Sequence, residues 1–218
     1  SRVLSDEKGT VLPGVYAAGE AACVSVHGAN RLGTNSLLDI VVFGKRAGQS
    51  MVDYVTQTKP NSISDSASDD LSKKIQNLID KEHTDEFSVA NIRKDLQESM
   101  EENAKIFRTK ETLEKQTEIL EELRERYENV TIFDKSKVHN SELVEAIELD
   151  YLLDMSEATV ASALARNESR GAHSRQDFPD RDDTNFMKHS FAFKKDNTAN
   201  LKYKDVELGK YEPMERKY

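Results

Sequence analysis

The chain has 218 residues, enough for one or two domains with a sizeable core, and its charged residues (33%) nearly equal its hydrophobic residues (37%). Its formal net charge of -9 excludes the basic footprint typical of nucleic-acid-binding proteins. The sequence has no apolar run near the roughly 20 residues that span a bilayer, and its single cysteine, Cys23, excludes an internal disulfide and favours a reducing compartment.

Several common motifs are missing from the sequence. There is no Walker A sequence and no Gly-x-Ser-x-Gly elbow, and the five histidines lack the cysteine partners of a zinc site. We therefore expect no metal centre, P-loop or serine-hydrolase site. The chain starts at Ser1 without an initiating Met, a signal peptide or a transit peptide, so we expect it to be the continuation of a longer polypeptide.

The first predicted elements are a turn over residues 4–13 and a short buried strand over residues 15–17, which ends just before Glu20. A glycine-rich loop follows, and Ser36 opens an apolar helix that runs to about Val55. The start of this helix is apolar nearly all round, so we expect it to be buried.

The loop brings together groups that bind anionic or hydroxylated ligands. In open α/β sheets, ligands bind where strands end and helices begin, because free N–H groups there favour negative charge. Glu20 is suited to accept hydrogen bonds from ligand hydroxyls, and Arg31 to bind a carboxylate or phosphate. Each residue also has a plain structural interpretation: Glu20 as a turn cap, Arg31 as an ion pair, and Ser36 as a helix cap.

A polar stretch over residues 59–66, with Pro60, predicts a linker. Four helices are predicted after it, and their short connections favour an antiparallel bundle. Ser66 or Ser68 is the expected cap of the first helix, and Ser88 that of the second. The third helix is predicted to start near Thr109, and the fourth to run from about Ser141 to Asn167. On that fourth helix the expected core face is Leu143, Ile147, Tyr151, Met155, Ala158 and Leu164.

Residues 167–183 are predicted to form a charged loop that ties helix to sheet through Arg–Asp pairs. His173 in this loop has two interpretations, an acid–base group or a support of the architecture, and we favour the second. Residues 186–193 and 200–206 alternate in part, with turn residues 195–198 between them, so they predict a β-hairpin followed by an extended tail.

The predicted fold class is α+β, mainly α. It consists of the end of an α/β domain (strand–loop–helix), a C-terminal helical bundle and a β-hairpin tail. The expected domains are residues 1–59, residues 60–170, and residues 171–218.

Two sequence segments carry a family resemblance. Residues 18–33 (AGEAACVSVHGANRLG) and 35–39 (NSLLD) resemble, almost position for position, the FAD-binding region of succinate dehydrogenase flavoprotein subunits and their fumarate reductase relatives. Residues 167–183 resemble a second signature of the same family. The resemblance implies the C-terminal part of such a subunit.

The resemblance implies FAD as cofactor, with Glu20, Ser36 and Leu37 as cofactor-binding residues and Arg31 as the residue that holds the substrate carboxylate. His27 either lines this site or packs beside it. The family's N-terminal Gly-x-Gly-x-x-Gly, its flavin-linked histidine and its proton-transferring arginine have no match in the sequence. We therefore expect no catalytic residue and no succinate turnover in this chain alone.

The implied reaction is succinate oxidation to fumarate, with electrons passed to an iron–sulfur subunit and quinone. The implied partners are that subunit, the membrane anchor subunits and the preceding part of the same polypeptide. The implied location is peripheral, on the matrix side of the mitochondrial inner membrane or the cytoplasmic face of a bacterial inner membrane. Alternatives are a quinol-linked fumarate reductase, an L-aspartate oxidase and a non-catalytic helical interaction module.

Overall fold

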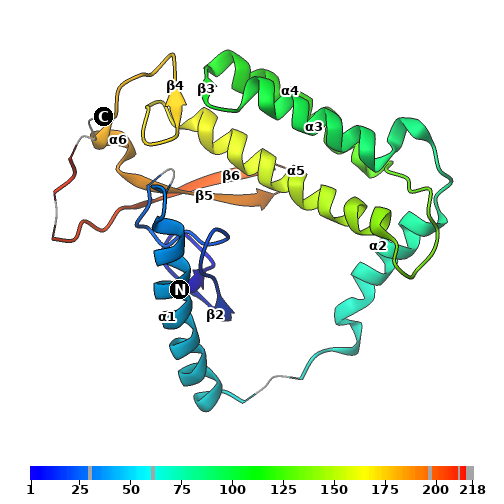
Figure 1. The fold of residues 1–218 in the computed structure, drawn as a ribbon, viewed down its shortest axis with the longest axis horizontal. Helices are drawn as coiled ribbons and strands as arrows, with labels where there is room; N and C mark the ends of the chain where they lie inside the picture. The colour runs from blue at the N-terminus through cyan, green and yellow to red at the C-terminus, as the bar shows by residue number, and fades with distance from the viewer. Residues whose placement is uncertain (29–30, 60–61, 196–197, 211, 215–218) are drawn as a thin grey trace.

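The computed structural model describes residues 1–28, 31–59, 62–195, 198–210 and 212–214. Figure 1 shows a blue N-terminal segment joined by a long connection to a helical bundle, with a hairpin between them. The elements in chain order are β1 (Arg2–Leu4), β2 (Val11–Tyr16), α1 (Asn35–Gln57), the 3-10 helix η1 (Asp65–Ser68), α2 (Asp69–Asp80), the 3-10 helix η2 (Asp85–Phe87), α3 (Val89–Asn103), β3 (Phe107–Arg108), α4 (Lys110–Glu128), α5 (Ser141–Ala165), β4 (Ser174–Arg175), α6 (Asp183–Phe186), β5 (Lys188–Lys195) and β6 (Thr198–Asp205).

The helical bundle holds the main hydrophobic core. Helices α3, α4 and α5 pack against one another, and α2 adds Leu78 at one end. The predicted cap of α3 is confirmed, since the Ser88 side chain accepts a hydrogen bond from the Asn91 N–H. Ser68 is the N-cap residue of α2 but makes no side-chain cap hydrogen bond. Helix α4 starts near Thr109 as predicted, and Thr109 forms a capping box with Thr112. The core residues include Val89, Ile92, Leu96, Leu113, Leu120, Leu123, Ile132, Leu149, Leu153 and Val160. The predicted mainly helical α+β fold, with bundle and hairpin, is confirmed.

The buried face of α5 differs from the predicted one. Tyr151 and Met155 are 58% and 65% exposed, whereas Leu149 and Leu153 are fully buried. The buried positions of this helix are Ala146, Leu149, Leu153, Val160 and Ala163. Leu143, Ile147 and Leu164 of the predicted face do pack against the core. The prediction was wrong at Tyr151 and Met155, because α5 carries apolar residues on more than one face and helical spacing alone fits two different stripes.

The N-terminal segment is much more exposed than expected. Strands β1 and β2 form an antiparallel hairpin, as the turn over residues 4–13 predicts, with Gly9 in the left-handed region at φ 90°. The predicted burial of the strand and of the start of α1 is wrong: Val15 is 41% exposed and Leu37 66%. Within the described residues, β2 pairs only with β1, and only Asp39 and Ala47 of α1 are buried.

Arg175 and Asp177 join the ends of two bundle helices. The buried guanidinium of Arg175 donates to the carbonyls of Ala163, Leu164 and Arg166, which are among the last ones of α5 and its cap. It also forms a bidentate pair with Asp177 at 2.8 Å. Asp177 in turn accepts the Lys110 N–H at the start of α4. The Arg–Asp pairs of the charged loop are thus confirmed, although they connect helix to helix.

The C-terminal hairpin lies between the bundle and the N-terminal segment (Figure 1). Strands β5 and β6 are antiparallel and contact α5. Asp196 and Asn197 of the predicted turn lie outside the described residues. The predicted domain boundaries, 59/60 and 170/171, remain predictions.

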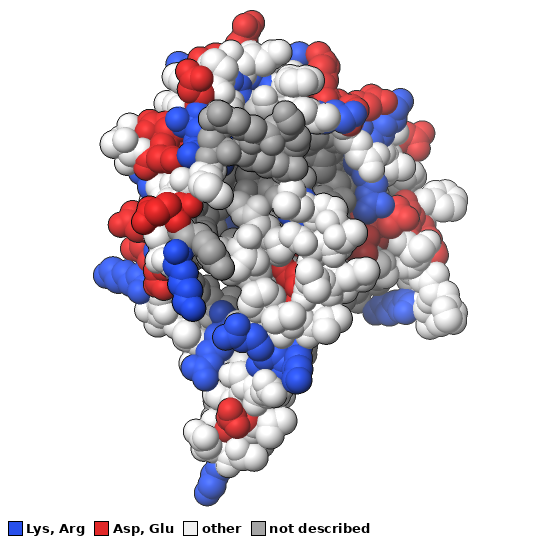
Figure 2. Space-filling view, turned by 60° about the vertical axis from the view of Figure 1, so that its left-hand side comes forward, with Lys and Arg blue, Asp and Glu red and all other residues white. Residues whose placement is uncertain are grey.

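On the face that Figure 2 shows, acidic and basic side chains gather toward the edges, and the described part of the middle is mostly white. Among the helices that the structure describes, none is both long and apolar enough to cross a membrane.

Candidate functional site

Glu20 and Arg31 lie together at one pocket, as the sequence predicts. The Arg31 Nη1 donates to the Glu20 Oε1 at 2.9 Å, and the two side chains are 37% and 81% exposed. The pocket has a volume of about 260 Å³ and is formed by the loop after β2, the start of α1 and β5. Its lining residues are Gly19, Glu20, Ala22, Cys23, Val24, Ser25, His27, Gly28, Arg31, Ser36, Asp39 and His189.

Asp39 is the buried residue that holds the loop in place. Its Oδ2 lies 2.5 Å from the His27 Nε2, and its Oδ1 accepts the Gly19 N–H at 3.1 Å. The hydrogen bond with His27 keeps the pKa of Asp39 below its ordinary value. His27 therefore both lines the pocket and packs against Asp39, so that its two predicted roles are compatible.

The start of α1 places Ser36 at the pocket but not Leu37. Thr34 is the N-cap residue, in the left-handed region at φ 68° and without a side-chain cap, so the interpretation of Ser36 as the helix cap is wrong. Ser36 lines the pocket, whereas the exposed Leu37 side chain is not among its lining residues. The Leu37 N–H donates to the Thr34 carbonyl at 3.1 Å.

His189 is a pocket residue that the sequence reasoning missed. It lies on β5, and its Nε2 is 2.9 Å from the Ser25 Oγ, a contact between residues 164 positions apart. Burial lowers the pKa of His189, and the neighbouring charges of Lys204 and Arg166 lower it further. No local pattern around residue 189 points to the loop at residue 25.

The other sequence-predicted histidine, His173, supports the architecture. It is buried at the end of the bundle, with its Nε2 3.1 Å from the Arg166 carbonyl and its Nδ1 3.1 Å from the Arg108 Nη1. Burial lowers its pKa, because the charged imidazolium is disfavoured away from water. These fixed contacts favour the structural interpretation over an acid–base role.

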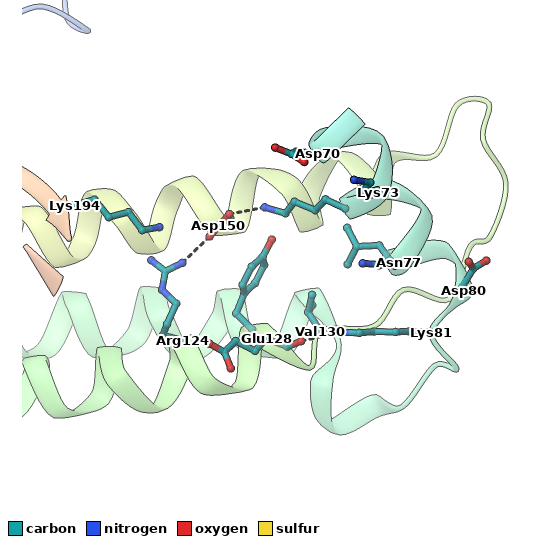
Figure 3. A pocket seen from close by; sticks show the side chains of 13 residues that line it. Asp70, Lys73, Asn77, Asp80, Lys81, Arg124, Glu128, Val130, Asp150 and Lys194 are labelled. Atoms are coloured by element: carbon teal, nitrogen blue, oxygen red, sulfur yellow. Dashed lines mark hydrogen bonds and ion pairs between the residues drawn. The ribbon is translucent and has the colours of Figure 1, made fainter. Parts of the chain in front are cut away.

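A larger pocket, of about 800 Å³, lies in the bundle between α2, α4 and α5 (Figure 3). Its main charges neutralise one another: Asp150 accepts hydrogen bonds from Lys74 at 2.5 Å and from Arg124 at 2.6 Å. Within the described part of the chain, no group of three or more His, Cys, Asp or Glu side chains is placed to hold a metal ion.

Comparisons with known proteins match the chain along most of its length. Residues 93–218 match the model of the fumarate reductase flavoprotein C-terminal family, and residues 1–37 match an FAD binding domain model. The succinate dehydrogenase flavoprotein subunit of Rickettsia bellii is 46% identical over 185 residues, which are 84% of this chain and 30% of that protein. The fumarate reductase flavoprotein subunit of Mycobacterium tuberculosis is 40% identical over 215 residues, 96% of this chain and 37% of that protein.

Solved structures of the same family also resemble this chain. A quinol-fumarate reductase with menaquinol molecules has a TM-score of 0.85 and 38% identity, covering 93% of this chain and 36% of that one. The Sdh1 complex of Mycobacterium smegmatis in the apo form has a TM-score of 0.81 and 30% identity, covering 92% and 34%. The chain spans about a third of the length of the relatives it matches.

Proposed function

Because this chain belongs to the succinate dehydrogenase and fumarate reductase flavoprotein family, we propose that it is the C-terminal part of a succinate dehydrogenase flavoprotein subunit. The proposed activity of the whole subunit is FAD-dependent oxidation of succinate to fumarate. The observation that carries the proposal is the convergence of Glu20, Arg31 and Ser36 on one pocket, within the segment that matches the FAD binding domain.

The residues at this pocket fit FAD. A cofactor with ribityl and ribose hydroxyls needs an accessible acceptor, and the Glu20 carboxylate is 81% exposed. The backbone at Gly28 and Gly33 is open: a Cβ added to either glycine would meet no described atom within 4 Å. Bound FAD supplies the hydride acceptor of the reaction.

The chain's own residues bind and orient in this proposal. Glu20 would accept hydrogen bonds from FAD hydroxyls. Ser36 would contact the flavin at the pocket and Leu37 from the exposed start of α1, where the helix dipole favours negative charge. Arg31 holds a substrate carboxylate, and its pairing with Glu20 keeps the guanidinium at the pocket. A carboxylate held in this way fixes the angle at which the dicarboxylate meets the flavin. No residue of this chain is assigned proton transfer.

Fumarate reduction by quinol is the same chemistry in reverse, and relatives of both names resemble this chain. L-aspartate oxidation is the further alternative. Testing succinate and L-aspartate in turn as the reductant of the flavin distinguishes it from succinate oxidation. A purely helical interaction module leaves the Glu20–Arg31 pocket without a role. Residues 24–26, Asp39 and the loop over residues 170–183 favour the succinate dehydrogenase branch over L-aspartate oxidase.

The proposed partners are an iron–sulfur subunit, membrane anchor subunits and the remaining part of the same flavoprotein subunit. The proposed location is peripheral, on the matrix side of the mitochondrial inner membrane or on the cytoplasmic face of a bacterial one. The name of one relative supports the mitochondrial setting, since it is the mitochondrial succinate dehydrogenase flavoprotein subunit of Oryza sativa, 43% identical over 205 residues. Other relatives are bacterial proteins.

The test replaces the matched third of the Rickettsia bellii flavoprotein subunit by residues 1–218 and records the visible spectrum before and after substrate. We expect flavin bands that bleach with succinate but not with L-aspartate, while the 218-residue chain alone gives no turnover. Retained flavin that succinate does not bleach would contradict the proposal. Comparing succinate oxidation with quinol-driven fumarate reduction decides the direction.

Variants of the same chimera test the site residues. Arg31→Lys should lower kcat/KM for succinate by about 100-fold with flavin content unchanged, because an ammonium cannot reproduce the two-point grip of a guanidinium. Glu20→Gln should lower the flavin content. Arg46→Lys, at an exposed arginine further along α1, is the matched control and should change neither quantity.

A further inference from the structure

The C-terminal hairpin contacts the pocket loop at one defined point. The His189 Nε2 on β5 lies 2.9 Å from the Ser25 Oγ, in the middle of the loop that carries Glu20 and His27. A second contact joins the two parts elsewhere, where the Lys202 Nζ lies 3.2 Å from the Glu7 Oε2. Glu7 lies in the turn that joins β1 to β2. The pocket loop begins at the other end of this hairpin, after β2.

Arg166 holds the residues on both sides of His189. Arg166 donates from its Nη2 to the Lys188 carbonyl at 2.6 Å and to the Ser190 Oγ at 3.2 Å. The same guanidinium pairs with Glu168, whose side chain is fully buried. His189 is therefore presented by a strand whose position is fixed from the end of α5.

Ser25 occupies a conformation that needs support. Its φ of 64° lies in the left-handed region, which residues other than glycine rarely adopt. It stands five residues after Glu20 and two before His27, and both of these residues line the same pocket. A hydrogen bond at Ser25 acts on the middle of this loop, while the Gly19–Asp39 bond fixes its start.

We propose that His189 is a positioning residue of the pocket: through Ser25 it holds the loop over residues 20–28 in the shape that brings Glu20 and Arg31 together. This inference rests on the proposed function, in which that loop is one side of the flavin and substrate site. It makes the C-terminal hairpin a part of the site although the hairpin supplies no group assigned to ligand binding.

Amide hydrogen exchange in the 218-residue chain, followed by NMR, tests this coupling. The reporters are the N–H groups of Gly19 and Ala22, which donate to Asp39 and to the Gly19 carbonyl. His189→Leu should raise their exchange rates at least fivefold. Ser25→Ala should give the same increase without any change on the hairpin, and the double variant should exceed neither single variant.

Three controls distinguish positioning from general stability. His189→Gln keeps a polar group at this place and should restore the slow exchange. Lys202→Gln removes the Lys202–Glu7 ion pair between hairpin and N-terminal segment and should leave the Gly19 and Ala22 rates unchanged. Exchange in α4 should stay constant in all variants, which shows that the bundle remains folded.

Rates within twofold of the parent chain in both His189→Leu and Ser25→Ala would overturn the inference. So would an equal increase with Lys202→Gln. The succinate bleaching of the chimera is measured separately. A coupled loop together with a chimera that fails to bleach would count against the proposed function, whereas an uncoupled loop in a chimera that bleaches would count against the role of His189.

Discussion

Arg124 is the buried cation to which several acidic side chains of α5 are attached. Its guanidinium, 9% exposed, donates to Asp150 and Asp154 at 2.6 Å and to Glu157 at 2.8 Å. These carboxylates stand on successive turns of one helix, so a single arginine on α4 neutralises a stripe that would otherwise repel itself. Lys74 reaches Asp150 from the other side (Figure 3).

Replacing Arg124 tests how much this network contributes to stability. We expect Arg124→Met to lower the free energy of unfolding by about 3 kcal/mol, since it leaves partly buried carboxylates without their partner. Urea denaturation measures this change. Arg126→Met, on the same helix, removes only the more exposed pair with Asp95 and should cost less than about 1 kcal/mol. Equal losses in the two variants would show that Arg124 is an ordinary surface ion pair.

The contacts of Arg124 also mark what sequence reasoning cannot supply. The residues around it alternate in charge on α4, which by itself indicates a solvated face with weak pairs. Its partners lie 26 to 33 positions away on another helix. Only the packing of α4 against α5 makes this one arginine buried while its neighbours remain at the surface.

At the scale of single elements, local signals were the most reliable. Ser88 was recognisable as a cap, and the start of α4 near Thr109 was predicted, because helix starts depend on residues within one turn. The hairpin of β5 and β6 was predictable from alternation and turn chemistry for the same reason. The buried face of α5 was not fully predictable. Its apolar residues lie on several sides of the helix, so the helices that pack against it determine which side is buried.

Alanine substitutions on α5 distinguish the observed face from the predicted one. Leu149→Ala should lower the free energy of unfolding by about 2–5 kcal/mol, because it opens a cavity in the bundle core. Met155→Ala, the matched truncation at an exposed position, should change it by less than about 0.5 kcal/mol. Thermal or urea unfolding of the 218-residue chain measures both. The reverse order of effects would restore the face that the sequence spacing suggested.

At the scale of the whole molecule, the core is unevenly distributed. The buried hydrophobic cluster lies entirely between residues 78 and 163, whereas α1 contributes only Asp39 and Ala47 as buried residues. Sequence reasoning found the strand–loop–helix order of the N-terminal segment but predicted it to be buried. Hydropathy shows that a face is apolar, and it does not show which element covers that face.

This uneven core predicts two levels of local stability. Amide exchange in α1 should be at least about tenfold faster than in α4, because few buried contacts oppose the opening of α1. Hydrogen exchange of the intact chain, resolved by mass spectrometry, measures both helices in one experiment. Matching rates in α1 and α4 would mean that the chain unfolds only as a single cooperative unit.

The exposed apolar side of α1 also governs how the isolated chain behaves in solution. Leu37, Leu38, Val41, Val52 and Val55 are each at least 60% exposed along one helix. Exposed apolar side chains at both ends of one helix favour association of molecules at high concentration, against the repulsion from a net charge of -9. The chain should therefore remain dispersed best at low protein concentration and low salt, because added salt screens the charge repulsion that opposes association.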